Sequence, residues 1–182
     1  VPSVGGLGFS SGTLSLSGVT QTNATPQTML ALSGTALLKL GANSAFNGNV
    51  SFQSPRLQIV TTTFNGPAFL EKTGAVNDSS TGGNIFNGAT TIKSSGTGWL
   101  RLATTTADDF NADASFVNAG TNVIDAAYTQ VNTFAGNLSA SAGVAFGSAG
   151  GTVELNGTNQ TISGSNLFNI LKKVAAGTDT LK

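Results

Sequence analysis

A phenylalanine followed by Asn-Gly, or by a close variant of this pair, recurs through the middle of the chain. The anchor residues are Phe46, Phe64, Phe86, Phe110 and Phe134, and they are separated by 18, 22, 24 and 24 residues. A repeat of this length is typical of solenoids, in which each unit forms one coil and stacks on the next. The spacing therefore predicts coils of about 18–24 residues.

Alignment on the anchors places Asn, and then Gly, at the next two positions of most repeats. We expect each Phe to point inward and the Asn-Gly pair to turn the chain. The corner predicted in this way consists of Phe46, Asn47, Gly48, Phe64, Asn65, Gly66, Phe86, Asn87, Gly88, Phe110, Asn111, Phe134 and Gly136.

Apolar residues alternate with polar or small ones on both sides of each anchor. Val50 and Phe52 stand four and six residues after Phe46, and the same offsets recur after the other anchors. Alternation with a period of two indicates a strand with one buried face. Segments rich in Gly, Asn and Ser separate the strands, and we expect them to supply positive φ at turns.

These patterns predict an all-β fold, a right-handed parallel β-helix of roughly eight coils. We interpret residues 1–182 as a single solenoid segment, excised from a longer repetitive chain, with clear repeats over residues 35–170. A β-sandwich also has short strands and frequent turns, but sandwiches rarely repeat one anchor motif in this way.

Charged residues are few, with eight basic and eight acidic side chains and no net charge. The alignment places Glu71 beside Lys93, and Arg101 beside Asp125, so we expect opposite charges to stack twice on the outer face. Nucleic acids and anionic membrane surfaces attract clustered Lys and Arg, which the chain lacks. It also has no apolar run of about 18 residues, so we expect no membrane insertion.

The side chains that most enzymes use are scarce. The sequence has no cysteine and no histidine, and its only glutamates are Glu71 and Glu154. Histidine is the commonest general base and metal ligand, and polysaccharide lyases and hydrolases need clustered carboxylates. We therefore expect no catalytic residues, no cofactor and no enzymatic activity.

One short motif resembles the start of a calcium loop. Asp109, Asn111 and Asp113 alternate as D-x-N-x-D, and calcium prefers several oxygen ligands. However, Ala114 stands where such a loop needs glycine, and Gly120 stands where it needs a bidentate glutamate. We therefore expect a solvated corner and keep these three residues only as a candidate calcium site.

Two aromatic residues fall on the outward parity of their strands, Phe69 and Trp99. Exposed aromatic side chains can mark a recognition surface, so both are candidate surface-binding residues. The alternative is a structural one, in which Trp99 covers a loop or packs against a neighbouring rod.

The segments TFNGPAFL, FNGATTIKSSGTGWLRLATTTADDFNADASFVNAGTN, VNTFAGNLSAS and GGTVELNGTNQTISG resemble the β-strand repeats of long surface proteins of Bacteroidota. These proteins include adhesins similar to the mobile gliding adhesins exported by type IX secretion. The resemblance covers roughly residues 35–170. It implies a secreted, stalk-like or fibre-like region that is displayed at the bacterial cell surface and takes part in attachment or surface movement.

From the resemblance we expect a structural and adhesive repeat module, outside the cell. Its partners would be flanking repeats of the same chain or copies of itself. The alternative is a module that binds surface polysaccharide through a lateral face, with Phe69 or Trp99. A polysaccharide-active enzyme is a third and more distant alternative.

Overall fold

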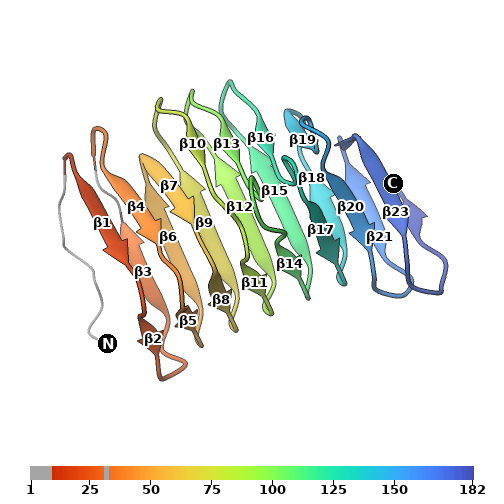
Figure 1. Cartoon of the computed structure of the whole chain (residues 1–182), viewed down its shortest axis with the longest axis horizontal. Coiled ribbons are helices and arrows are strands. Elements are labelled where there is room, and N and C mark those ends of the chain that lie inside the picture. Colours follow the sequence, from red (N-terminus) through yellow and green to blue (C-terminus); the bar gives the residue numbers. More distant parts are fainter. Residues whose placement is uncertain (1–9, 31–32) are drawn as a thin grey trace.

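The computed structural model describes residues 10–30 and 33–182, and in these residues the chain forms 24 strands and no helix. All strand pairs are parallel, and successive strands follow one another around a three-sided coil that is repeated eight times. Figure 1 shows the coils side by side along the long axis, with β1 near one end and β23 near the other. The chain is therefore an all-β parallel β-solenoid. The described part of the chain contains no helix that could cross a membrane.

The three sides of the coil form three faces. The first face has a three-stranded sheet followed by a five-stranded sheet. The strands of the first sheet are β1 (Thr13–Leu16), β4 (Leu37–Leu40) and β7 (Arg56–Ile59). Those of the second are β10 (Asp78–Ser79), β13 (Leu100–Arg101), β16 (Ile124–Asp125), β19 (Val144–Phe146) and β22 (Leu167–Phe168).

The second and third faces are each one eight-stranded sheet. The second face consists of β2 (Thr20–Gln21), β5 (Ser44–Phe46), β8 (Thr62–Phe64), β11 (Ile85–Phe86), β14 (Asp109–Phe110), β17 (Val131–Phe134), β20 (Thr152–Leu155) and β23 (Ile170–Lys173). The third consists of β3 (Gln27–Leu30), β6 (Val50–Ser54), β9 (Ala68–Lys72), β12 (Thr90–Ser94), β15 (Ala114–Asn118), β18 (Leu138–Ala140), β21 (Thr161–Gly164) and β24 (Thr180–Leu181).

The five anchor phenylalanines stack in one row inside the second face, as the alignment predicted. Each pairs in register with the next, and all five are at most 3% exposed. Consecutive ring centroids are 5.5, 5.0, 4.6 and 4.7 Å apart, with nearly parallel planes. Stacked aromatic pairs add about 0.5–1.5 kcal/mol each beyond the burial of their area. Leu155 continues the row in the next coil.

A second row of side chains runs along the outer corner next to the phenylalanines. The amide Nδ2 of Asn65 donates to Oδ1 of Asn47 at 2.7 Å, Asn87 donates to Asn65 at 2.7 Å, and Asn111 donates to Asn87 at 2.8 Å. The sequence predicted a corner here but not this ladder of side-chain hydrogen bonds. Ala135 has no amide group, so the ladder ends at Asn111.

The glycines of this corner are required by the close approach of successive coils. A methyl group on Gly66 would lie 2.6 Å from the carbonyl carbon of Gly48, and one on Gly88 would lie 2.3 Å from that of Gly66. Neither residue has a positive φ, whereas Gly143 and Gly147, in the turn segments, do. The expected positive φ is therefore confirmed for some turns. The corner needs glycine for another reason, because a side chain there would collide with the backbone of the preceding coil.

The first face is interrupted between β7 and β10. Asp78 and Ser80 occupy positions that apolar residues fill in the following coils. Their side chains accept hydrogen bonds from the backbone, Oδ2 of Asp78 from Leu57 N at 3.3 Å and Oγ of Ser80 from Ile59 N at 3.0 Å. Side-chain oxygens therefore take donors that a continuous ladder would have paired with carbonyls. The buried Asp78 also forms an ion pair with Arg56 at 3.0 Å.

The two predicted charge pairs have different outcomes. Glu71 and Lys93 are in register and form an ion pair at 3.1 Å, which confirms the first contact, although Glu71 is buried where an exposed pair was expected. Arg101 and Asp125 are also in register, but the expected exposed ion pair does not form. Asp125 is fully buried and accepts hydrogen bonds from the backbone of the next coil instead. The predicted register of Arg101 and Asp125 is therefore correct, but the predicted ion pair between them is wrong.

We expect Gly66→Val to unfold the protein or lower its melting temperature strongly, because its side chain would collide with the backbone of the preceding coil. Ser115→Val, on the outer side of β15, is the matched control, since a strand accepts a β-branched residue there. Thermal unfolding followed by circular dichroism measures both. Equal melting temperatures for Gly66→Val and the parent chain would contradict the close approach at this corner.

Candidate functional site

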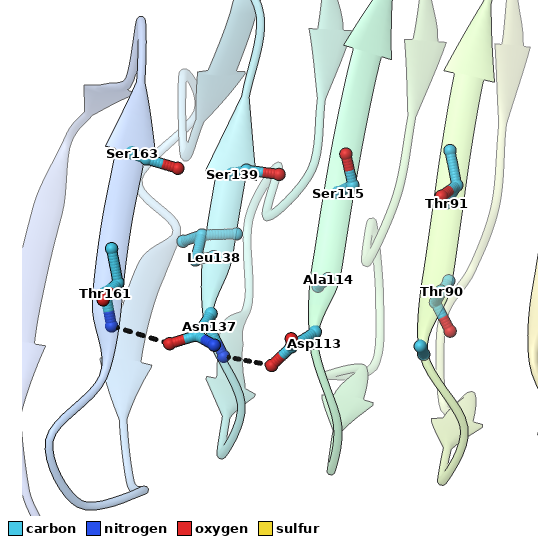
Figure 2. A pocket seen from close by; sticks show the side chains of 11 residues that line it. Thr90, Thr91, Asp113, Ala114, Ser115, Asn137, Leu138, Ser139, Thr161 and Ser163 are labelled. Atoms are coloured by element: carbon cyan, nitrogen blue, oxygen red, sulfur yellow. Dashed lines mark hydrogen bonds between the residues drawn. The ribbon is translucent and has the colours of Figure 1, made fainter. Parts of the chain in front are cut away.

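A shallow groove runs across the outer side of the third face. It has a volume of about 460 Å³ and crosses β12, β15, β18 and β21. One hydroxyl side chain from each of these strands lies in register along it, Thr91, Ser115, Ser139 and Ser163 (Figure 2). Successive hydroxyls are therefore one strand spacing apart, about 4.8 Å.

The lower edge of the groove is formed where the strands begin. The backbone N–H of Asn137 donates to Oδ1 of Asp113 at 2.8 Å, and that of Thr161 donates to Oδ1 of Asn137 at 2.8 Å (Figure 2). Asp113 is the one ionisable residue among the lining residues. A nucleophilic hydroxyl needs an adjacent base, and no histidine or lysine lines the groove. The groove can therefore offer hydrogen bonds to a polar ligand, and its one carboxylate already accepts a hydrogen bond from the backbone of Asn137.

Phe69 lies on the same outer row as Thr91, one coil earlier, and is half-buried. Its neighbours Ala68 and Leu70 are buried, so its outward placement is as predicted. It lines a second depression of the third face, of about 330 Å³, with Thr91 and Pro67. Phe69 therefore lies on the outer surface of the third face, beside the groove but not among its lining residues.

Trp99 lies on the first face, directly before β13, so the structure does not bring it together with Phe69. Its ring packs on the guanidinium of Arg101, whose Cζ is 4.0 Å from the ring centroid. The ring of Tyr128 covers the guanidinium as well, at 4.3 Å. The sequence pattern missed Arg101 as the partner of Trp99, and Tyr128 as the second ring on this guanidinium. Strand parity could have indicated Arg101, which stands two residues after Trp99 on the same face.

The side chains of the three candidate calcium ligands form hydrogen bonds with neighbouring coils. Oδ1 of Asp109 accepts a hydrogen bond from the hydroxyl of Thr133 at 2.7 Å, Oδ1 of Asp113 accepts from Asn137 N, and Asn111 belongs to the amide ladder. In the residues that the structure describes, no group of three or more Asp, Glu, His or Cys side chains is arranged to hold a metal ion.

A buried polar row runs inside the corner between the first and second faces. Oδ1 of Asn84 accepts from Thr62 N at 3.0 Å, Oδ1 of Asp108 from Asn84 N at 2.9 Å, and Oδ1 of Asn132 from Asp108 N at 2.8 Å. Each side chain thus pairs with the backbone of the preceding coil. Asp108 also accepts from Nδ2 of Asn84 at 2.8 Å.

Asp108 is the most perturbed ionisable group in this row. Burial raises the pKa of its carboxyl to about 7, although the two hydrogen bonds from Asn84 act in the opposite direction. Its Oδ2 is buried without a hydrogen-bond partner. A pKa near neutrality often marks a general acid or base, but the residue is only 1% exposed, so a substrate cannot reach it. Asp108 therefore affects stability, not catalysis.

Comparisons with models of protein families and with curated proteins find no match for this chain, and a comparison with solved structures finds none either.

Asp108 should make the folded state less stable as the pH rises. The unfolded carboxyl ionises near its ordinary pKa of 3.8, whereas the folded one keeps its proton until about pH 7. The free energy of unfolding therefore falls between about pH 4 and pH 7, by at most roughly 4 kcal/mol. We expect Asp108→Asn to remove this loss and to be more stable than the parent chain at pH 8.

Urea unfolding of the parent chain and the variant at pH 4 and pH 8 measures this effect. Asp113→Asn, an exposed carboxyl in the same coil, is the control. A stability difference between Asp108→Asn and the parent chain that is the same at both pH values would refute the assignment.

Proposed function

We propose that this chain is a structural and adhesive repeat module of an extracellular bacterial surface protein or fibre. In this role it acts as a stiff stalk or filament in attachment or surface motility. The observation that supports this most is the register of the eight coils, which is continuous on the second and third faces and is interrupted on the first face only between β7 and β10. At about 4.8 Å per coil, the segment would extend a surface structure by roughly 40 Å.

Three rows of contacts support a mechanical role, because each connects successive coils. These rows are the stacked phenylalanines, the asparagine ladder at the outer corner and the buried polar row that contains Asp108. Bending or stretching the solenoid would strain all three rows together with the backbone ladders. Contacts that repeat over several successive coils thus favour stiffness along the axis.

Flanking repeats or copies of the same chain are the proposed partners. The last coil, formed by β22, β23 and β24, pairs with a neighbour on one side only. It exposes several large apolar side chains, and an unpaired strand edge is a template for further parallel strands. These side chains are Leu167, Ile170, Leu171, Val174 and Leu181.

The extracellular location and the adhesive context are supported by the resemblance of residues 35–170 to bacterial surface repeats. We further propose that the module is not an enzyme, since neither histidine nor lysine lines the groove on the third face, and its one carboxylate, Asp113, accepts a hydrogen bond from Asn137 N. The alternative function, a module that binds polysaccharide through a lateral face, is favoured by one observation, the aromatic and guanidinium cluster around Trp99.

The mechanical role can be tested by pulling the chain between its two ends in a single-molecule force experiment. We expect the folded segment to resist extension and then to open at forces well above those that stretch an unfolded chain. Phe110→Ala should lower the opening force, because a buried Phe→Ala change costs about 3–5 kcal/mol. Ser115→Ala, on the outer row, is the control. If the parent chain extends as easily as an unfolded one, the stalk proposal fails.

A further inference from the structure

The guanidinium of Arg101 lies between two aromatic rings on the outer side of the first face. Its Cζ is 4.0 Å from the ring centroid of Trp99 and 4.3 Å from that of Tyr128. The side chain is partly exposed, but its Nε is buried and has no hydrogen-bond partner. Both ring centroids are therefore within 4.3 Å of the guanidinium carbon, while the side chain keeps a part exposed to a further partner.

The fold holds this arrangement from two successive coils. Trp99 and Arg101 point outward on either side of the fully buried Leu100. Tyr128 comes from the following coil, where its backbone N–H donates to the carbonyl oxygen of Leu102 at 3.0 Å. The three side chains are thus positioned by the backbone of the solenoid. A site whose groups are held in advance loses less conformational freedom when it binds.

The charge of Arg101 is not neutralised by a direct contact in the described part of the chain. Asp125 is the carboxylate in register beside it. Both oxygens of Asp125 accept hydrogen bonds at 3.0 Å elsewhere, Oδ1 from Gly147 N and Oδ2 from Ser148 N. By contrast, the other arginine, Arg56, forms an ion pair. A partly buried guanidinium without an ion pair therefore distinguishes this cluster.

We propose that Trp99, Arg101 and Tyr128 form a binding site for an acidic sugar unit, one that carries a carboxylate or a sulfate group. The planar fork of a guanidinium matches the two oxygens of such a group, and a donor that is partly removed from water makes a stronger charged hydrogen bond. Trp99 and Tyr128 are half-buried, and the exposed parts of their rings offer apolar surface to a sugar ring beside that group. The ligand class is an acidic polysaccharide, either a polyuronate or a sulfated glycan.

The site has one positive charge, that of Arg101, so it would bind one acidic group at a defined position and would not attract polyanions in general. The chain has no net charge, so it offers no general attraction for polyanions, and one arginine is too little for a nucleic acid backbone. This site rests on the alternative function proposed above, a face that binds polysaccharide, and specifies its ligand class; it does not depend on the mechanical role. A stalk without this site would still resist extension.

Trp99 is the only tryptophan of the chain, so its fluorescence reports directly on the site. The full chain would be titrated with polygalacturonate, with dextran sulfate and with neutral dextran, and each titration repeated by calorimetry. We expect saturable binding of at least one acidic polymer with a change in Trp99 emission, and no binding of dextran. The polymer that binds identifies the oxyanion as a carboxylate or a sulfate.

Arg101→Gln should weaken this binding at least tenfold, and Arg101→Lys should weaken it as well, because lysine keeps the charge without the planar fork. Lys93→Gln, which removes one positive charge from the third face, is the matched control and should bind as the parent chain does. Circular dichroism confirms that each variant is folded, and calorimetry of Tyr128→Ala tests the second ring.

Three results would overturn the site: no binding of either acidic polymer by calorimetry, equal binding of neutral dextran, or an equal loss of affinity in Lys93→Gln and Arg101→Gln. None of them bears on the force experiment, so the failure of this site and the failure of the stalk proposal are distinguishable.

Discussion

The structure depends on one constraint, the exact repetition of side-chain direction from coil to coil. Parallel strands about 4.8 Å apart place each inward residue on the inward residue of the next coil. The phenylalanine row satisfies this constraint with stacked rings, and the asparagine ladder satisfies it with hydrogen bonds. The corner glycines allow the backbones to approach closely enough for both. A residue that breaks one row therefore disturbs two neighbouring coils.

The same constraint explains where polar groups are buried. Asn84, Asp108 and Asn132 take equivalent places in three consecutive coils, and each side chain accepts a hydrogen bond from the backbone of the coil before it. Asn132 also donates Nδ2 to the carbonyl of Ala126, whereas Oδ2 of Asp108 has no partner. Asp108 thus places a carboxyl where the neighbouring coils have an amide, and ionisation of this buried carboxyl makes the stability of the fold depend on pH.

Specific surface chemistry occurs where the repeat is irregular. The regular outer row of the third face carries similar small hydroxyl groups in successive coils, so no coil differs chemically from the next along this row. On the first face, by contrast, the buried Asp125 is held by Gly147 and Ser148 of the next coil, and Tyr128 covers Arg101. The continuous rows support the mechanical proposal, while this irregular cluster supports the binding proposal. The two proposed roles would use different parts of the same solenoid.

The sequence by itself determined the fold class, the coil length and the register, because the Phe anchors and the period-two alternation are local patterns that stacking must repeat. It also placed Phe69 and Trp99 outward by parity. Only the tertiary structure decided what those side chains meet. Tyr128 reaches Arg101 from another coil, and Asp125 turns to a later loop, since neither contact follows from the repeat. Such contacts depend on loop paths at the coil corners, which lack the periodicity that made the strands predictable.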